Sequence, residues 1–241
     1  MRHALSVVPA LCGLVILSVM FVLSPIFRVS DIEITGNERL SNEYILEASG
    51  LDKPVNIFLY SPHKAQNELL KNLLLESASI SKLYPDKLQI SVQERHPIGY
   101  AKHQGAYLCL DEDGMVLSVS QAPDKPLPVI SGLEFDSYAL GEPISAGKSE
   151  TFETMVFLAN LLEKHSLLES EGVSRVDVGD TSDIHLYIYN IDVAIGRIDN
   201  ADEKIRTMKA IVKGELPDAQ NVKGTLDVRV IGSQYYFKVL T

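Results

Sequence analysis

The sequence predicts an α+β protein with an N-terminal transmembrane helix, a small β-α-α-β-β domain and a larger sheet-dominated domain with two helices. Three observations predict this class. Residues 4–27 are apolar and uncharged, residues 28–97 carry strand patterns around two helix patterns, and residues 98–241 carry mainly short alternating segments. Strands and helices that do not alternate regularly favour an α+β fold over a parallel α/β fold.

The uncharged N-terminal run is expected to be a membrane anchor. About 20 consecutive apolar residues cross a bilayer as a helix, whereas the core of a cleaved signal peptide spans roughly 7–15 residues and ends at a small-residue site. No such site closes residues 4–27. Because Arg2 and Arg28 flank the run, the positive-inside rule is nearly balanced. The simplest topology is a cytoplasmic tail of residues 1–3, one span and an exported body.

The composition excludes several classes of protein. The net charge is -10, and all 32 acidic residues lie beyond Arg28. This argues against a nucleic-acid binder, which needs a basic face, and against a domain held flat on anionic lipid by its charge. The cysteines are Cys12, inside the apolar run, and Cys109, so neither a disulfide framework nor a metal cage is expected.

The small domain begins with a strand that ends at the turn Gly36-Asn37. Two helices are expected next: the first has Ser41 as N-cap, and the second has Ser61 as N-cap and Pro62 at its first position. Leu69, Leu70 and Leu73 form the predicted inner stripe of the second helix. Two strands joined by a Pro85-Asp86 turn then complete the domain.

The last strand of this domain ends with an acidic residue on its apolar side. Leu88, Ile90 and Val92 alternate along one face, and the same parity places Glu94 with them, just before Arg95, His96 and Pro97. Neighbouring strand residues point to opposite faces, so these polar residues cannot converge as a catalytic set. We expect a structural junction, in which Glu94 leaves the core at its rim and can accept backbone hydrogen bonds, and Pro97 stops the ladder.

The larger domain is expected to contain short strands and two helices. A hairpin over residues 105–119 turns at Asp113-Gly114, and a Pro-rich segment leads into one short strand. The remaining segments are listed in order: a helix over 151–168, three strands within 174–198, a helix over 200–216 capped by Asn200, and strand material over 224–240.

Residue patterns give no support for an enzyme. His185 alternates with Tyr187 and Tyr189 on what is expected to be a half-exposed strand face. Residues 177–183 hold three aspartates but lack the spacing of a calcium loop, so a solvated turn is expected. Nucleophile, phosphate-loop and zinc motifs do not occur. We therefore expect no catalytic, cofactor-binding or metal site and no small-molecule substrate.

Several short motifs follow one another along the sequence. Their residues are Gly36 and Asn37, Glu94, Arg95 and Pro97, Asp111 and Gly114, Leu127, Pro128 and Gly132, and finally Asp227 and Arg229. The order of these motifs resembles that of the bacterial cell division proteins FtsQ and DivIB. The likeness covers nearly the whole exported part and is strongest from Val29 to Gly132.

This resemblance implies a POTRA domain over residues 28–97, beside the membrane, and an FtsQ/DivIB-type β domain over residues 98–241. It also implies a scaffold at the division septum in the cell (inner) membrane. The partners would be FtsB, called DivIC in many Gram-positive bacteria, and FtsL, through a partner strand added to a C-terminal sheet edge. The expected contact residues are Leu226, Val228, Val230, Tyr235 and Tyr236, with Val230 replacing a tyrosine that is frequent in the family.

Two other functions stay open on the sequence alone. A POTRA-containing export or outer-membrane assembly factor would normally carry a barrel of many ten-residue strands, and residues 98–241 offer too few strands together with two helices. A membrane-anchored cell-wall enzyme would need a convergent nucleophile, base or metal. The scaffold is the preferred interpretation.

Overall fold

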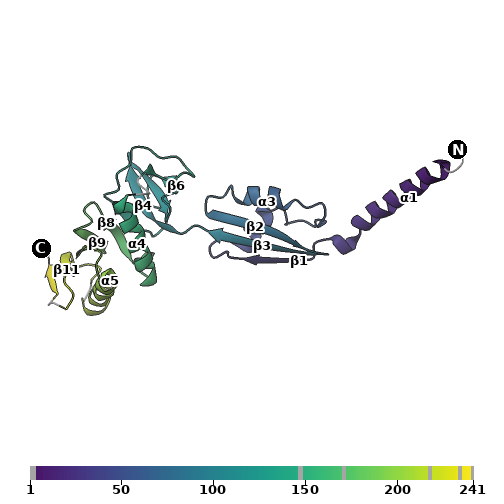
Figure 1. Cartoon of the computed structure of the whole chain (residues 1–241). Helices are drawn as coiled ribbons and strands as arrows, with labels where there is room; N and C mark the ends of the chain where they lie inside the picture. Colours follow the sequence, from purple (N-terminus) through teal and green to yellow (C-terminus); the bar gives the residue numbers. More distant parts are fainter. Residues whose placement is uncertain (1–3, 146–148, 170–171, 217–218, 233–234, 240–241) are drawn as a thin grey trace. The chain divides into compact units, whose positions relative to one another are not determined.

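The structure is a computed structural model, and it describes residues 4–145, 149–169, 172–216, 219–232 and 235–239. The chain divides into two compact units, Met1–Arg95 and His96–Thr241 (Figure 1). Each unit has its own sheet: three strands in the first and nine in the second. The two units are described separately below.

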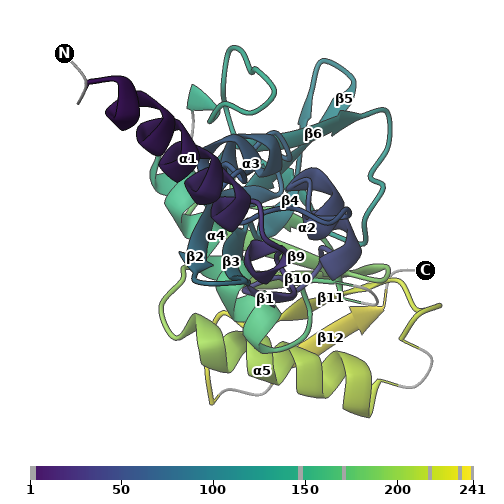
Figure 2. The same cartoon turned by 90° about the vertical axis from the view of Figure 1, so that its right-hand side faces the viewer.

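The first unit places two helices on one face of its three-stranded sheet (Figures 1 and 2). The strand order is β1-β3-β2, with β1 parallel to β3 and β2 antiparallel to it. The elements are α1 (Ala4–Val22), a 3-10 turn η1 (Pro25–Phe27), β1 (Asp31–Thr35), α2 (Asn42–Ala48), α3 (Pro62–Leu69), β2 (Leu75–Leu83) and β3 (Lys87–Glu94).

The N-terminal run forms one helix. α1 has 19 residues, none of them charged, and large apolar side chains from Leu11 to Leu23 are exposed. Within the part of the chain that the structure describes, no helix has both the length and the apolar character needed to cross a bilayer.

The predicted helix caps and inner stripe of the first unit are only partly confirmed. The Ser41 hydroxyl accepts a hydrogen bond from the backbone N–H of Tyr44 at 3.2 Å, so the predicted cap of α2 is confirmed. Ser61 occupies the N-cap position of α3, but its side chain makes no capping bond. The assignment of Leu70 and Leu73 to an inner stripe of this helix is wrong, because α3 ends at Leu69. Leu70 is exposed, and Leu73 lies in the turn before β2.

The second unit is built on one mixed sheet in the order β12-β11-β10-β9-β8-β7-β4-β5-β6. The strands are β4 (Pro97–His103), β5 (Ala106–Asp111), β6 (Val116–Ser120), β7 (Val129–Ser131), β8 (Val173–Asp177), β9 (Ile184–Ile188), β10 (Ile191–Gly196), β11 (Gly224–Asp227) and β12 (Tyr236–Val239). Its helices are α4 (Glu150–Lys164) and α5 (Ala201–Ala210), and α5 continues into a π turn, Ile211–Glu215.

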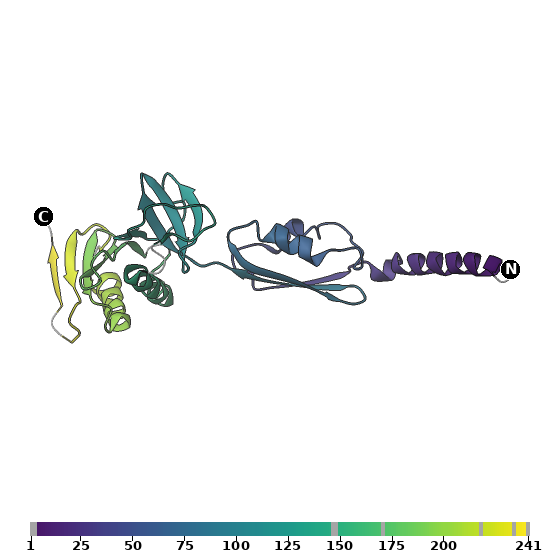
Figure 3. The same cartoon turned by 45° about the horizontal axis from the view of Figure 1, so that its top comes forward.

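Both helices of the second unit lie on the same face of its sheet (Figures 1 and 3). Strand alternation explains why. In β9, Ile184, Leu186 and Ile188 are buried, whereas His185 and Tyr187 lie on the other face and are half-buried. The helices contribute apolar side chains such as Met155 of α4 and Met208 of α5 to the same core. The predicted α+β class is confirmed, and no helix of the described residues lies on the other face of the sheet.

Candidate functional site

The outermost strand at one end of the nine-stranded sheet is β12, coloured yellow in Figures 2 and 3. Its one neighbour among the described strands is β11, and the two are antiparallel. β11 in turn lies between β12 and β10, and it is parallel to β10. The expected contact residues therefore cannot all lie on the open edge, because β11 is already paired on both sides and the open edge is β12.

The five predicted contact residues occupy different environments. Leu226 and Val228 are each 1% exposed and belong to the core on the helix-covered side. Val230 is 65% exposed in the turn after β11, and Tyr235 is half-buried just before β12. Tyr236, at 72% exposure, is the one residue of this set that lies on the edge strand itself. A contact role for Leu226 and Val228 is thus incompatible with their burial.

The backbone groups of β12 that face outward can be assigned from the register. Val228 donates its N–H to a β10 carbonyl at 3.0 Å, so the residues of β11 with the same parity point toward β10. The intervening β11 residues bond β12, where their partners are Tyr236 and Lys238. In β12, Phe237 and Val239 therefore direct their N–H and C=O groups to the open edge. Sequence patterning alone did not separate these residues from the rest of the C-terminal segment.

The opposite end of this sheet is less open. β6 is the last strand there, and the segment that contains Gly141 and Glu142 runs along it. Val116 donates its N–H to the carbonyl of Glu142 at 3.1 Å and accepts from the N–H of Gly141 at 2.9 Å. A covered edge cannot add a further strand at that point. In the first unit, β1 and β2 are the edge strands of the sheet.

The helix-free face of the sheet carries two polar rows that end on β12. Residues directly opposite each other on neighbouring strands share a face. Register places the first row as Arg175, Tyr187, Asp192, Thr225 and Lys238, and the second as Asp177, His185, Ala194, Asp227 and Tyr236. The edge strand and the open face thus form one continuous polar surface.

The first row borders a hollow of about 480 Å³. The guanidinium of Arg175 lies 3.6 Å from the centre of the Tyr187 ring, a cation–π contact. Lys223 also lines the hollow, and Lys238 follows in the same row on β12. In the described part of the chain, no carboxylate lies within ion-pair distance of these three cations. Asp192 also lines the hollow, but its carboxylate pairs with His185, so the three cations make this a cationic region on an acidic molecule.

The second row contains a histidine held between carboxylates. His185 Nδ1 lies 2.6 Å from Asp192 Oδ1, and its Nε2 lies 3.6 Å from Asp183 Oδ2. Burial by itself lowers the pKa of His185, but the hydrogen bond and charge of Asp192, with the charge of Asp183, outweigh it and raise that pKa. Arg229 binds Asp227 at 2.5 Å and Asp183 at 3.7 Å. Among the residues described, no His, Cys, Asp and Glu group could hold a metal ion.

Glu94 is buried inside the domain, which corrects the expectation that its side chain leaves the core at the rim. Its side chain is 5% exposed. Glu94 Oε1 accepts hydrogen bonds from the backbone N–H groups of Glu38 at 3.0 Å, Arg39 at 3.2 Å and Leu40 at 2.9 Å, and Oε2 accepts from Arg39 at 3.0 Å. A carboxylate that satisfies three orphan donors is stable inside a domain. The carboxylate on the apolar face thus fixes the loop between β1 and α2.

Two further motif residues support the same loop. Gly36 has φ +84°, and a Cβ there would lie 2.0 Å from the carbonyl oxygen of Val92, so only glycine fits. Asn37 Nδ2 donates to the carbonyl of Leu40 at 2.9 Å. Beside Glu94, Arg95 donates its backbone N–H to Leu74 at 2.8 Å. These residues shape the first unit and lie far along the chain from the β12 edge.

The motif residues of the second unit also shape turns and strand ends. Asp111 Oδ1 accepts backbone N–H bonds from Asp113 at 3.0 Å and Met115 at 2.8 Å, and Gly114, in this turn, has φ +76°. Gly132 has φ +90° and lies against the backbone of Gly179. The remaining members have these places: Pro97 begins β4, Leu127 is buried, the carbonyl of Pro128 accepts the Tyr100 N–H at 2.8 Å, and Asp227 ends β11 beside Arg229.

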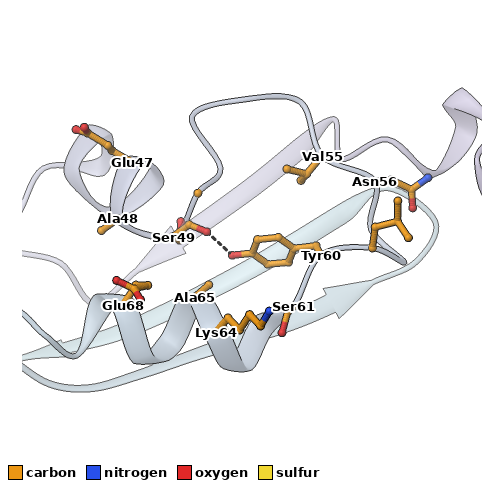
Figure 4. A pocket seen from close by; sticks show the side chains of 12 residues that line it. Glu47, Ala48, Ser49, Val55, Asn56, Tyr60, Ser61, Lys64, Ala65 and Glu68 are labelled. Carbon is orange, nitrogen blue, oxygen red and sulfur yellow. Dashed lines mark hydrogen bonds between the residues drawn. The ribbon is translucent and has the colours of Figure 1, made fainter.

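A separate hollow of about 590 Å³ lies between α2 and α3 of the first unit (Figure 4). The Tyr60 hydroxyl crosses it and donates to the backbone carbonyl of Ser49 at 3.0 Å. Burial raises the pKa of Tyr60, and a smaller effect of the Ser49 side chain opposes it. The hydroxyl therefore stays protonated and acts as a structural donor. Glu47, Lys64 and Glu68 border the hollow without forming a nucleophile–base pair.

Comparison with known families assigns both units. Residues 27–95 match the model of the POTRA domain of FtsQ type. Residues 99–229, more than half of the chain, match the model of the FtsQ/DivIB C-terminal domain. The chain belongs to the FtsQ/DivIB family of cell division proteins. The expected POTRA domain followed by a sheet-rich domain is confirmed.

Individual members of the FtsQ/DivIB family are similar over most of their length. The cell division protein DivIB of Clostridium botulinum is 28% identical over 216 residues, which cover 88% of this chain and 82% of that protein. DivIB of Listeria monocytogenes is 28% identical over 232 residues, covering 95% and 80%. The cell division protein FtsQ of Syntrophotalea carbinolica is 30% identical over 195 residues, covering 80% and 67%. The role of this FtsQ/DivIB-family chain therefore lies in cell division.

Proposed function

We propose that this protein is a non-enzymatic scaffold of the divisome that binds FtsB or DivIC, and through it FtsL, by adding a partner strand to β12. The single observation that carries the proposal is the open edge of β12, where Phe237 and Val239 direct their backbone groups outward. Strand addition to such an edge uses main-chain hydrogen bonds and needs little rearrangement.

Main-chain pairing alone is too weak to explain stable capture. Phe237 and Val239 offer four outward backbone groups, and at about 0.5–1.5 kcal/mol net for each hydrogen bond they supply about 2–6 kcal/mol. A micromolar complex needs about 8 kcal/mol. Side chains must therefore contribute, and exposed Tyr236 is suited to this because tyrosine is a frequent interface anchor.

The charges next to the edge favour an acidic partner strand. Arg175, Lys223 and Lys238 lie on or beside the row that ends on β12, and none of them has a carboxylate partner among the described residues. The chain as a whole carries a net charge of -10, so these cations stand out from their surroundings. We infer that acidic side chains of the partner occupy this cationic region, which would also fix the register of the added strand.

We further propose that residues 4–27 cross the cell (inner) membrane once, with residues 1–3 in the cytoplasm and the two units outside it, at the septum. The absence of charge along this run and the exposed apolar side chains of α1 support the proposal. Anchoring confines the protein and its membrane-bound partners to one plane, which raises their effective concentration without any new contact.

The test uses a proline that removes one outward N–H. Val239→Pro deletes an edge donor and places a ring at the edge, whereas Val239→Ala removes the side chain and keeps the donor. Full-length chains serve as bait, and co-purified FtsB or DivIC and FtsL are quantified. We expect about a tenfold loss or more with proline, equal to about 1.4 kcal/mol, and little change with alanine.

Undiminished capture by a correctly folded Val239→Pro chain would exclude the β12 mechanism. Substitutions at Val228 cannot serve in its place. The Val228 N–H bonds β10 and its side chain is buried, so a proline there would disrupt the sheet itself.

A further inference from the structure

In the first unit, the end of the POTRA domain next to α1 exposes a group of large apolar side chains. They are between 41% and 70% exposed. They come from three separate segments: the η1 turn, the loop before α3, and the β2–β3 hairpin at the last residue of β2 and in the turn that follows. We call this group the base patch, and it consists of Ile26, Phe58, Leu59, Leu83 and Tyr84.

Ring contacts join these segments into one surface. The Phe27 ring lies 4.8 Å from Phe58, and Phe58 lies 5.3 Å from Tyr84, measured between ring centroids. Phe27 also contacts Phe21, near the end of α1, at 5.1 Å. A continuous line of aromatic rings therefore runs from the last turns of α1 to the hairpin turn. Figures 1 and 3 show that turn beside the C-terminal end of α1.

One side-chain and one backbone hydrogen bond hold the patch at this position. Asn56 Nδ2 donates to the carbonyl of Val22, in the last turn of α1, at 2.8 Å. Ile57 donates its N–H to the carbonyl of Phe27 at 2.8 Å. Leu59 lines an apolar hollow of about 410 Å³ together with residues of α1 from Leu14 to Val22 and with Leu23, just after the helix. The loop that carries Phe58 and Leu59 is thus attached directly to the helix end.

We propose that the base patch is seated in the interfacial layer of the lipid bilayer, so that the POTRA domain rests on the membrane from which its anchor emerges. The inference rests on the proposed anchor over residues 4–27. Amphipathic rings such as that of Tyr84 favour the headgroup level, and leaving several large apolar groups in water is unfavourable.

A lipid bilayer is the expected partner of the base patch, because the exposed apolar surface of α1 continues into the patch without a charged residue between them. Arg28 is the first charge after the run, and with Lys82 it borders the patch. Neither has an ion-pair partner in the described chain, so both are available to lipid phosphates. Because the protein is acidic overall, the contact depends on apolar insertion more than on charge. Seating restricts how far the POTRA domain tilts about its anchor.

Tryptophan reporters test the proposal, because the chain contains no tryptophan. Three full-length variants are reconstituted singly in phosphatidylcholine–phosphatidylglycerol vesicles, with and without brominated acyl chains. Tyr84→Trp reports on the base patch and Leu17→Trp on α1. Gln93→Trp is the matched control, because this exposed residue of β3 lies about 20 Å along the strand from the hairpin turn.

We expect bromolipid quenching and a blue-shifted emission for Tyr84→Trp and Leu17→Trp, and neither effect for Gln93→Trp. If Leu17→Trp is quenched but Tyr84→Trp behaves like Gln93→Trp, the proposed contact of the base patch with the bilayer is wrong. The proposed anchor over residues 4–27 would still stand. Absence of quenching at Leu17→Trp would refute the anchor and the seat together.

A charge inserted into the patch provides the second readout. Leu59→Glu in the Tyr84→Trp background should reduce the quenching, because a carboxylate resists burial in the interface. Leu70→Glu, at another exposed leucine of the same domain, should leave it unchanged. Equal effects of the two substitutions would contradict a specific insertion of the base patch into the bilayer. Circular dichroism would verify that both variants are folded.

Discussion

Replacing the Glu94 carboxylate should destabilise the POTRA domain by removing the acceptor of three loop amides. In Glu94→Gln, one oxygen remains to accept from Glu38, Arg39 and Leu40, but the charge is lost and an NH₂ group faces a backbone donor. Glu94→Ala removes both acceptors. The loop carrying the donors reaches solvent at Glu38 and Arg39, so water can satisfy part of what is lost.

The magnitude follows from these contacts. Hydrogen bonds to a charged group contribute about 1.5–3 kcal/mol each, and roughly twice as much as neutral ones. Losing the charge while keeping one acceptor should therefore reduce the free energy of unfolding by about 1–2 kcal/mol. Losing all three bonds, with partial replacement by water, should reduce it by about 3–4 kcal/mol.

Two measurements check this, both on the full chain in detergent micelles. Urea unfolding gives the stability change, and hydrogen exchange of the Glu38, Arg39 and Leu40 amides gives its location. Glu76→Gln is the matched control, because Glu76 is an exposed carboxylate on the neighbouring strand and should change stability by less than about 0.5 kcal/mol. The assignment of Glu94 as the loop acceptor is wrong if Glu94→Gln and Glu76→Gln have the same free energy of unfolding and the hydrogen exchange of the loop amides is unaltered.

Two further predictions concern the second unit. We compare Gly132→Ala with Gly105→Ala, because the two glycines have nearly the same φ, +90° and +89°. A Cβ at Gly132 would lie 2.2 Å from the Gly179 nitrogen, whereas no atom of the described residues lies within 4 Å of a Cβ at Gly105. Urea unfolding should therefore show a loss of about 1–2 kcal/mol at Gly105 and a clearly larger one at Gly132, and equal losses would contradict the close approach. Because the folded-state pKa of His185 is raised, its stabilisation is present below about pH 6.5 and lost as pH rises through the raised value. Asp192→Asn should accordingly destabilise the protein more at about pH 6 than at about pH 9, and a pH-independent effect would count against the charged pair.

Much of the architecture could be predicted from local patterns in the sequence. Period-two alternation placed Leu88, Ile90 and Val92 in one core and put Glu94 on the same side. The glycine turns at Gly36 and Gly114 have the positive φ that such turns require. The order of elements, the α+β class and the family resemblance follow from these signals, because each depends on residues close together in the chain.

The partner of Glu94 could not be found in this way. Its donors lie 54–56 residues earlier in the chain, in a loop whose own sequence gives no sign of an acceptor. Alternation indicates which face a residue occupies, but it says nothing about what closes over that face. A buried carboxylate on an apolar face was therefore visible as an anomaly, and its explanation required the folded domain.

The sequence by itself determined the two-unit body, the strand faces and the family of this protein. Only the tertiary structure decided which strand is left open. β11 pairs in parallel with β10 after the intervening helix α5, and β12 covers the other side of β11. The outward backbone groups therefore belong to Phe237 and Val239, and not to Leu226 and Val228. Side-chain periodicity is a property of one strand, whereas an edge is a property of the whole sheet, set by long-range pairing that no single segment encodes.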